Sequence, residues 1–320
     1  MSIKLIDINK DAEVYQKLND KLMPSVFNSI PWIKMFGALK LYGIYNANNE
    51  LIGSFYFFSF KKWGLSVNIT PPFTPHNGLC FENRAENSAN INSFNKNIMN
   101  EISDFIYGLK SKLTVFSLPV GALETQPFAW KNMEVKVKYT YHIDLTQPEE
   151  TLLANLSSEK RKSLNKAKSD ALEIVRETDM EKVRQIILKT FSRKQISKNA
   201  DYFSKILFEF ATENNSISFV AYHNNKAIAA TFCVYDSNTA YYLFGGYDAE
   251  FKHHGAGVSC MWQSILFAKK MGLKTFDFEG SMIPEVEKYF REFGGVLVPY
   301  YVVYQATWPL KTILKLGKRL

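Results

Sequence analysis

Two parts of the chain repeat one pattern of hydrophobic and polar positions. Residues 42–58 (YGIYNANNELIGSFYFF) and 219–235 (FVAYHNNKAIAATFCVY) each place an Asn-rich turn between two runs of aromatic and β-branched residues. Asn tolerates the left-handed backbone of tight turns, so each segment predicts a β-hairpin. Residues 97–116 and 261–278 then each predict an amphipathic helix, a Gly-Leu-Lys turn and a strand. Because both pairs of segments follow the same order, they predict two copies of one α/β unit.

The second copy predicts further helices and strands, in an order that favours a mixed α/β sheet. The chain is expected to divide near residues 139–148, which gives a first domain of residues 1–140 and a second of residues 141–320. The predicted helices of the second domain are residues 149–170, 180–191, 202–212 and 258–271, and its predicted strands are 172–177, 216–223, 227–235, 240–247, 274–279 and 296–307.

Residues 274–295, KTFDFEGSMIPEVEKYFREFGG, place polar chemistry at the end of a predicted strand. Asp277 and Glu279 alternate with two phenylalanines, so both carboxylates should lie on one face of that strand. Gly280 and Ser281 follow, and the next helix should end at Gly294. Sites in α/β sheets form at such strand ends, although a solvated strand edge beside a capped helix would have the same pattern. The helix is expected to direct inward Ile283, Val286, Phe290 and Phe293.

Composition restricts the class of protein. The chain has 320 residues, of which 46% are hydrophobic and 15% aromatic, so it has enough apolar surface for two folded domains. Its three cysteines form no CxxC pair, and the adjacent His253 and His254 have no third ligand at a suitable spacing, which argues against a disulfide scaffold or a metal site. The acidic N-terminal segment is unlike a signal peptide, and no apolar run is long enough to span a membrane. We therefore expect a soluble cytoplasmic protein.

The net charge of +8 is concentrated in clusters, which indicates an anionic partner such as a phosphate-bearing ligand, although solvated helix faces would give the same pattern. The C-terminal residues 307–320, TWPLKTILKLGKRL, combine basic and apolar residues. They can lie on an anionic membrane surface or pack as a terminal helix. No stable protein partner is evident. The clustered basic residues are Lys160, Arg161, Lys162, Lys166 and Lys168, then Arg193, Lys194 and Lys198, and finally Lys311, Lys315, Lys318 and Arg319.

Three sets of segments follow one another in a distinctive order: YTYHIDL with the basic KRKSLNKAKS, then HGAGVSCMWQSILFAKKMG, and then FDFEGSM with YFREFGG. In this order they resemble the GNAT acyltransferase superfamily, and more narrowly its Fem-type aminoacyl (peptidyl) transferase-like branch. The resemblance implies an α/β fold of two GNAT-like domains, each a mixed, mostly antiparallel sheet flanked by helices. There is no coiled-coil insertion, and Lys252 and His253 stand where acetyl-CoA-binding members have an Arg.

The resemblance also implies transfer of an acyl or aminoacyl group to an amine. Glu279 is the candidate for deprotonating or anchoring the amine, with Asp277 second, and Tyr247 can donate to the developing oxyanion or to the leaving group. A cleft is expected at the strand ends, where backbone N–H groups at a helix start receive phosphate. Arg161 and Arg291 are expected to share an anionic ligand, Arg291 having a surface pair with Glu287 as the alternative. The residues expected around the cleft, besides the catalytic candidates, are His254, Gly255, Gly257 and Ser281.

Three functions remain open at this point. The first is an N-acyl or aminoacyl transferase, with acyl-CoA or aminoacyl-tRNA as donor and a cell-envelope precursor among the candidate acceptors. The second is an acyl-CoA-dependent transferase acting on a sugar, lipid or polysaccharide precursor. The third is a non-catalytic GNAT-like module whose basic surface binds nucleic acid or an anionic membrane.

Overall fold

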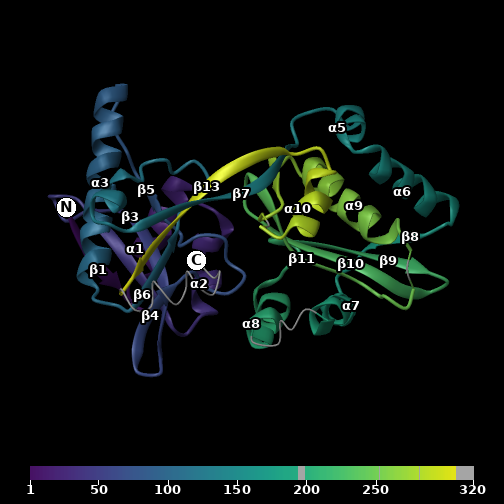
Figure 1. The fold of residues 1–320 in the computed structure, drawn as a ribbon, viewed down its shortest axis with the longest axis horizontal. Helices are drawn as coiled ribbons and strands as arrows, with labels where there is room; N and C mark the ends of the chain where they lie inside the picture. Colours follow the sequence, from purple (N-terminus) through teal and green to yellow (C-terminus); the bar gives the residue numbers. More distant parts are fainter. Residues whose placement is uncertain (194–198, 252, 281, 308–320) are drawn as a thin grey trace. The chain divides into compact units, whose positions relative to one another are not determined.

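The structure is a computed structural model that describes residues 1–193, 199–251, 253–280 and 282–307. The chain forms two compact units (Figure 1). Unit 1 contains Met1–Lys138 and the chain from Pro299, and unit 2 contains Tyr139–Val298. The predicted domain limits, 1–140 and 141–320, differ from this division because the last strand belongs largely to unit 1. The predicted limits are not tested by a division into compact units, and they remain a prediction.

Unit 1 is a mostly antiparallel sheet with helices packed against it. Strands β1, β2, β3 and β4 are antiparallel neighbours, and β4 pairs in parallel with β6. The buried side chains include a cluster of phenylalanines around Phe55 and Phe116, whose rings meet edge to face. The strands are β1 (Ser2–Ile6), β2 (Leu39–Tyr45), β3 (Leu51–Lys62), β4 (Leu65–Ile69), β5 (Cys80–Phe81) and β6 (Leu113–Ser117), and the helices are α1 (Ala12–Leu22), α2 (Ile30–Lys34), α3 (Ser88–Gly108) and α4 (Gln126–Trp130).

Unit 2 repeats this plan. Strands β8, β9, β10 and β11 form an antiparallel meander, and β11 pairs in parallel with β12. Helix α9 packs on one face of the meander and α7 on the other (Figure 1). The strands are β8 (Glu173–Arg176), β9 (Ser216–His223), β10 (Lys226–Tyr235), β11 (Thr239–Tyr247) and β12 (Thr275–Asp277), and the helices are α5 (Glu149–Asn155), α6 (Ser158–Ser169), α7 (Met180–Arg193), α8 (Ala200–Lys205), α9 (Ala256–Lys270) and α10 (Pro284–Arg291).

The two units exchange their last strands. Strand β7 (Glu134–Asp144) follows the last helix of unit 1 but pairs with β12 in unit 2. Strand β13 (Val296–Ala306) follows the last helix of unit 2 but pairs with β6 in unit 1. Each also contributes to the core it joins, since Ile143 is buried in unit 2 and Val303 in unit 1. The fold is thus α/β, with a mixed, mostly antiparallel sheet flanked by helices in each unit.

Three local predictions need correction. The helix predicted over residues 149–170 is two helices, because Leu156 is extended and buried and the Ser157 side chain caps α6 by accepting from the Lys160 N–H. The helix predicted over residues 202–212 is α8 followed by a π-helical turn, Ile206–Phe210. Ile283 does not point inward: it precedes α10 and is 57% exposed. Within the described ranges, no helix is both long and apolar enough to cross a membrane.

Candidate active site

The site is built around an opening between β11 and β12. The two strands pair only between Thr239–Tyr241 and Thr275–Asp277, and β11 then continues to Tyr247 whereas β12 ends. A bulge lies just past the paired stretch: Cys233 of β10 faces Tyr242 and Phe232 faces Phe244, so Leu243 is an extra residue. A bulge bends its strand and increases the local twist. The end of β11 is therefore free to line a cavity.

That cavity has a volume of about 610 Å³ and lies at the N-terminus of α9. Its apolar wall comes mainly from aromatic residues of β11 and α10. Tyr247, His254 and Gly257, all predicted from the sequence, line it. Its lining residues are Thr190, Ala230, Thr231, Tyr242 to Tyr247, His253, His254, Gly257, Val258, Glu285, Val286, Tyr289 and Phe290.

The two glycines at the start of α9 have different tasks. A Cβ on Gly255 would lie 2.4 Å from the backbone oxygen of Ser163 and 2.8 Å from the Ala167 side chain, so Gly255 lets α9 pack closely on α6. Among the described residues, a Cβ on Gly257 would come within 4 Å only of the Tyr289 hydroxyl, at 3.9 Å. The N-cap residue of this helix, Gly255, has no side chain with which to cap it. The partial positive charge of the helix N-terminus is thus presented at the cavity beside Gly257, as anion binding requires.

His253 holds the loop before α9 in place. Its Nδ1 accepts a hydrogen bond from the backbone N–H of Gly255 at 3.1 Å, so the ring proton sits on Nε2, which lies 3.0 Å from the Asp170 carboxylate. Hydrogen bonds from Lys166 and then from His253 lower the pKa of Asp170 to about 2. From the sequence, His253 stood out only as a rejected metal ligand and as a replacement for an Arg, and this positioning role was not predicted.

Asp277 is an anchoring group. It is buried and accepts hydrogen bonds from the Thr140 hydroxyl at 2.5 Å and the Glu279 backbone N–H at 2.8 Å. Its other oxygen lies 3.0 Å from Nε2 of His142. Because both carboxylate oxygens have neighbours within the fold, Asp277 fixes the end of β12. It does not line the 610 Å³ cavity, and a catalytic role for Asp277 remains a prediction.

Glu279 combines a strained backbone with a buried carboxyl group. Its φ is +60° and that of Gly280 is +69°, so the chain leaves β12 through two left-handed residues, a conformation that costs free energy for a Glu. Oε1 is buried and has no hydrogen-bond partner among the described residues. Burial, and then the nearby charge of Asp277, raise the pKa of Glu279 well above its usual range. Strain and a perturbed pKa together are typical of functional groups. Glu279 lies outside the residues that line the cavity.

Tyr289 is a wall residue that the sequence interpretation missed. Its hydroxyl is the group nearest to the open side of Gly257, and burial raises its pKa. The Lys160 ammonium lies 3.7 Å from the centre of the Tyr289 ring and 3.2 Å from the Glu292 carboxylate. These contacts join α6 to α10 and fix the ring against the cavity. The Tyr-Phe-Arg run was visible in the sequence, but only Phe290 and Arg291 were singled out there.

The structure does not bring the two predicted arginines to the cavity. Arg161 donates from Nη1 to the backbone oxygens of Ala154, at 2.9 Å, and Leu156, where α5 ends. The Nε atom of Arg291 lies 3.5 Å from the Glu287 carboxylate, in the surface pair considered as its alternative role. A role of either arginine in binding an anion remains a prediction, and Ser281 lies outside the described residues.

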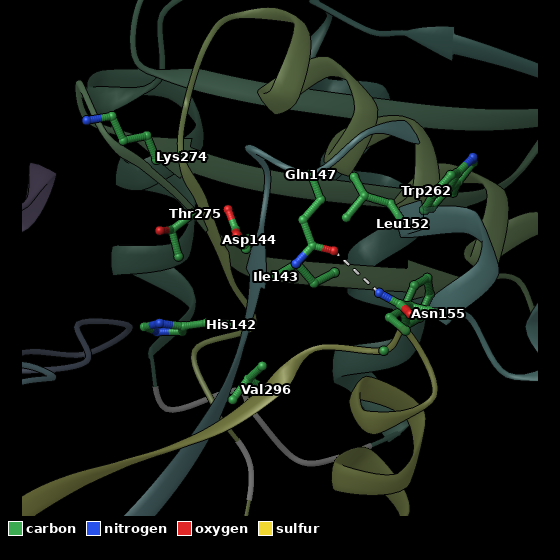
Figure 2. Close-up of a pocket in the computed structure, with 12 residues that line it drawn as sticks. His142, Ile143, Asp144, Gln147, Leu152, Asn155, Trp262, Lys274, Thr275 and Val296 are labelled. Atoms are coloured by element: carbon green, nitrogen blue, oxygen red, sulfur yellow. Dashed lines mark hydrogen bonds between the residues drawn. The ribbon is translucent and has the colours of Figure 1, made fainter. Parts of the chain in front are cut away.

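A second cavity of about 370 Å³ lies beside β7, within unit 2. Figure 2 shows Gln147 and Asn155 pointing toward one another along it, and their side chains are 3.5 Å apart. His142 and Lys274 also line it. Among the described residues, none of those predicted as catalytic or phosphate-binding lines this second cavity. The second cavity is therefore distinct from the 610 Å³ cavity at the start of α9.

Comparison with known proteins identifies the fold. The sequence pattern of the acetyltransferase (GNAT) domain family matches residues 155–291, which span the meander, α9, β12 and α10. The chain has a GNAT-superfamily fold. No curated protein matches the sequence significantly.

Solved structures with this fold cover nearly the whole chain. FemX superposes with a TM-score of 0.67 at 11% identity, covering 98% of this chain and 100% of its own. The C-terminal domain of a putative lysylphosphatidylglycerol synthetase from Agrobacterium fabrum gives 0.60 at 12% identity, with 97% and 96% covered. A tandem GNAT protein from the clavulanic acid biosynthesis pathway gives 0.56 at 9% identity, with 95% and 98% covered. At these identities the likeness shows the shared GNAT fold, which the resemblance had implied.

Proposed function

We propose that the protein is an N-acyltransferase that moves an acyl or aminoacyl group from an activated donor to an amine. The observation that carries this proposal is the 610 Å³ cavity, in which an uncapped helix N-terminus meets the open end of β11. A donor with a phosphate group and an acyl ester or thioester matches it, because the phosphate suits the helix dipole and the acyl chain suits the aromatic wall. Both acyl-CoA and aminoacyl-tRNA have this chemistry.

The proposed reaction needs few groups from the protein. The amine nitrogen attacks the donor carbonyl carbon, the C–S or C–O bond to the leaving group breaks, the amine loses a proton and the leaving group gains one. We propose Glu279, which has a raised pKa but lies outside the residues that line the cavity, as the proton acceptor. The hydroxyl of Tyr247 or of Tyr289, both on the cavity wall, is the proposed donor to the oxyanion or the leaving group. Because the donor is already activated, positioning supplies much of the remaining acceleration.

A cell-envelope precursor is the proposed acceptor class. FemX and the C-terminal domain of a putative lysylphosphatidylglycerol synthetase share the fold over nearly the whole chain. The name of the second protein describes a product in which a lysyl group is attached to a phospholipid. The test is to incubate the protein with acetyl-CoA or with aminoacyl-tRNA and a panel of amines, and to follow acyl transfer by mass spectrometry. Transfer from only one donor identifies the donor. No transfer from either, together with no change in melting temperature on adding CoA or aminoacyl-tRNA, would contradict the proposal.

Gly257→Val should block donor binding without unfolding the protein. The new side chain would enter open space beside Tyr289 and narrow the cavity at the helix N-terminus. We expect the melting temperature without ligand to stay within about 2 °C of the wild-type value. The apparent affinity for the donor, measured from the rise in melting temperature that the donor causes, should fall by at least tenfold. Gly108→Val is the matched control, since Gly108 ends α3 in unit 1 and also faces open space. Donor binding as strong as in the wild type would place the donor elsewhere.

Arg291→Ala tests the predicted phosphate contact. If Arg291 binds an anionic ligand, replacing it should weaken the binding free energy of that ligand by about 1.5–3 kcal/mol, because a charge-assisted hydrogen bond is lost. Calorimetry measures this change. The free protein should keep its melting point, since the exposed pair with Glu287 contributes under about 1 kcal/mol. Arg184→Ala is the control, because Arg184 forms a similar helical pair with Glu181 on α7. Reduced stability with unchanged binding would assign Arg291 to its surface pair alone.

A further inference from the structure

The turn between β3 and β4 carries a residue that its backbone disfavours. Trp63 and Gly64 are the two residues of the turn, with φ values of +50° and +74°, as in a type I′ turn. That turn favours Asn-Gly or Gly-Gly, and a bulky residue there costs free energy. The Trp63 side chain is not buried in return, because it is 87% exposed. Neither the turn nor the core of unit 1 therefore accounts for a Trp at this position.

The side chains around Trp63 are apolar at the tip and basic behind it. Leu65, the first residue of β4, directly follows the turn and is also exposed. Lys61 and Lys62 precede the turn and are exposed, and the Lys62 ammonium lies 4.9 Å from the Trp63 ring centre. Within the described residues neither lysine forms an ion pair with an acid. The hairpin tip, defined here as Lys61–Leu65, is thus a protruding amphipathic surface with unneutralised positive charge.

The basic character continues at the base of this hairpin. The backbone N–H of Lys112 donates to the oxygen of Ser66, so exposed Lys112 lies next to β4. The backbone N–H of Thr307 in turn donates to the oxygen of Lys112. Thr307, which directly follows β13, therefore lies beside Lys112 at the base of this hairpin.

We propose that the hairpin tip docks unit 1 on an anionic lipid bilayer. Trp is favoured at the membrane–water interface, where its ring lies among the headgroups. Leu65 adds an aliphatic side chain, whose burial in the bilayer is favourable in free energy. Lysines beside the tip are attracted by anionic headgroups. A nucleic acid would also attract the lysines and stack a base on the indole, but its binding relies on charge and stacking and does not require an exposed leucine. This proposal is independent of the acyl-transfer chemistry.

The test is vesicle co-sedimentation with Trp63→Asn. This substitution gives the turn its favoured Asn-Gly sequence, so the melting temperature should stay unchanged or rise. Binding to vesicles of phosphatidylcholine mixed with phosphatidylglycerol should fall about tenfold. Binding to phosphatidylcholine alone should be weak for both proteins, and added salt should weaken binding to the anionic vesicles. Lys61→Glu with Lys62→Glu should lower anionic binding by a further factor of about ten or more.

Trp130→Asn is the matched control. Trp130 is also in unit 1, is 65% exposed and lies 5.3 Å from a lysine, Lys96, but that lysine is paired with Glu124 at 2.6 Å. Its replacement should leave vesicle binding unchanged. Vesicle binding that is insensitive to Trp63→Asn, or equally reduced by Trp130→Asn, would overturn the proposal. Loss of affinity for tRNA with vesicle binding retained would assign the tip to nucleic acid instead.

Discussion

Glu279→Gln should lower the rate of acyl transfer by about 10²-fold or more while making the folded protein more stable at neutral pH. The glutamine keeps the size of the side chain but cannot accept a proton, so a chemistry-limited reaction loses its base. The stability effect has a separate origin, because the buried Oε1 atom has no hydrogen-bond partner among the described residues and the pKa of Glu279 is raised above the ordinary value of 4.5. Turnover is measured with the donor and acceptor found by the mass-spectrometric assay.

The sign of the stability effect follows from proton binding. Below about pH 4 the carboxyl is protonated in both the folded and the unfolded chain, so wild type and variant should melt together. As the pH rises through 4.5 the unfolded chain loses this proton while the folded chain keeps it, so the wild type is progressively destabilised until the pH reaches the folded pKa. The glutamine variant escapes this loss. At about pH 8 its melting temperature should be higher by roughly 2–4 °C.

Glu181→Gln provides a control of opposite sign. Hydrogen bonds from Arg184 lower the pKa of Glu181 in the folded protein. The ionised Glu181 therefore stabilises the fold above the pKa that it has in the unfolded chain, and this stabilisation disappears as the pH falls through the folded-state pKa. Replacing this exposed carboxylate should slightly lower the melting temperature at neutral pH and leave turnover unchanged. Full activity in Glu279→Gln would reassign Glu279 to a structural role, and a lower neutral-pH melting temperature would show that its carboxyl is ionised and paired.

Gly255→Ala should destabilise unit 2 by about 3 kcal/mol, whereas Gly257→Ala, two residues on, should be neutral or stabilising. The added methyl at position 255 has to displace backbone atoms, because it would lie 2.4 Å from the Ser163 oxygen and 3.1 Å from the Ala167 nitrogen. The methyl at position 257 meets nothing closer than 3.9 Å and sits in a helix, where Ala is preferred to Gly. Urea unfolding of both variants measures the difference.

The comparison is sharp because both substitutions add one methyl group to the same helix start. Equal stability of the two variants would mean that α6 and α9 do not pack as closely as the structure has them. Loss of stability in Gly257→Ala alone would reverse the assigned roles of the two glycines. A fall in donor affinity in Gly257→Ala, without any loss of stability, agrees with an anion bound at this helix start.

The sequence predicted the elements whose signals are local. The paired Asn224 and Asn225 do adopt positive φ, and the β9–β10 hairpin forms around them as predicted. The end of β12 could not be predicted in this way. Residues 274–279 alternate as a strand should, but the strand stops at Asp277 because the Glu279 backbone turns left-handed, which alternation does not encode.

Tertiary packing decided the rest of the site. Tyr247, His254 and Gly257 were placed at the cavity because strand ends and helix starts can be located from local patterns. Tyr289 was missed because its position depends on how α10 packs against α9. The contacts of Arg161 with the end of α5 could not be foreseen either, since they depend on a helix break at Leu156 that the sequence interpretation read through.

The exchange of β7 and β13 has a consequence for biosynthesis. The N-terminal unit can add β13 beside β6, and bury Val303, only after residues 296–306 have left the ribosome. Until then the edge of β6 is unpaired, and such edges promote aggregation. Unit 1 should therefore depend on chaperones until β13 has been synthesised. A stop codon just before β13 should leave unit 1 insoluble, even though the coding sequence for unit 2 is nearly intact.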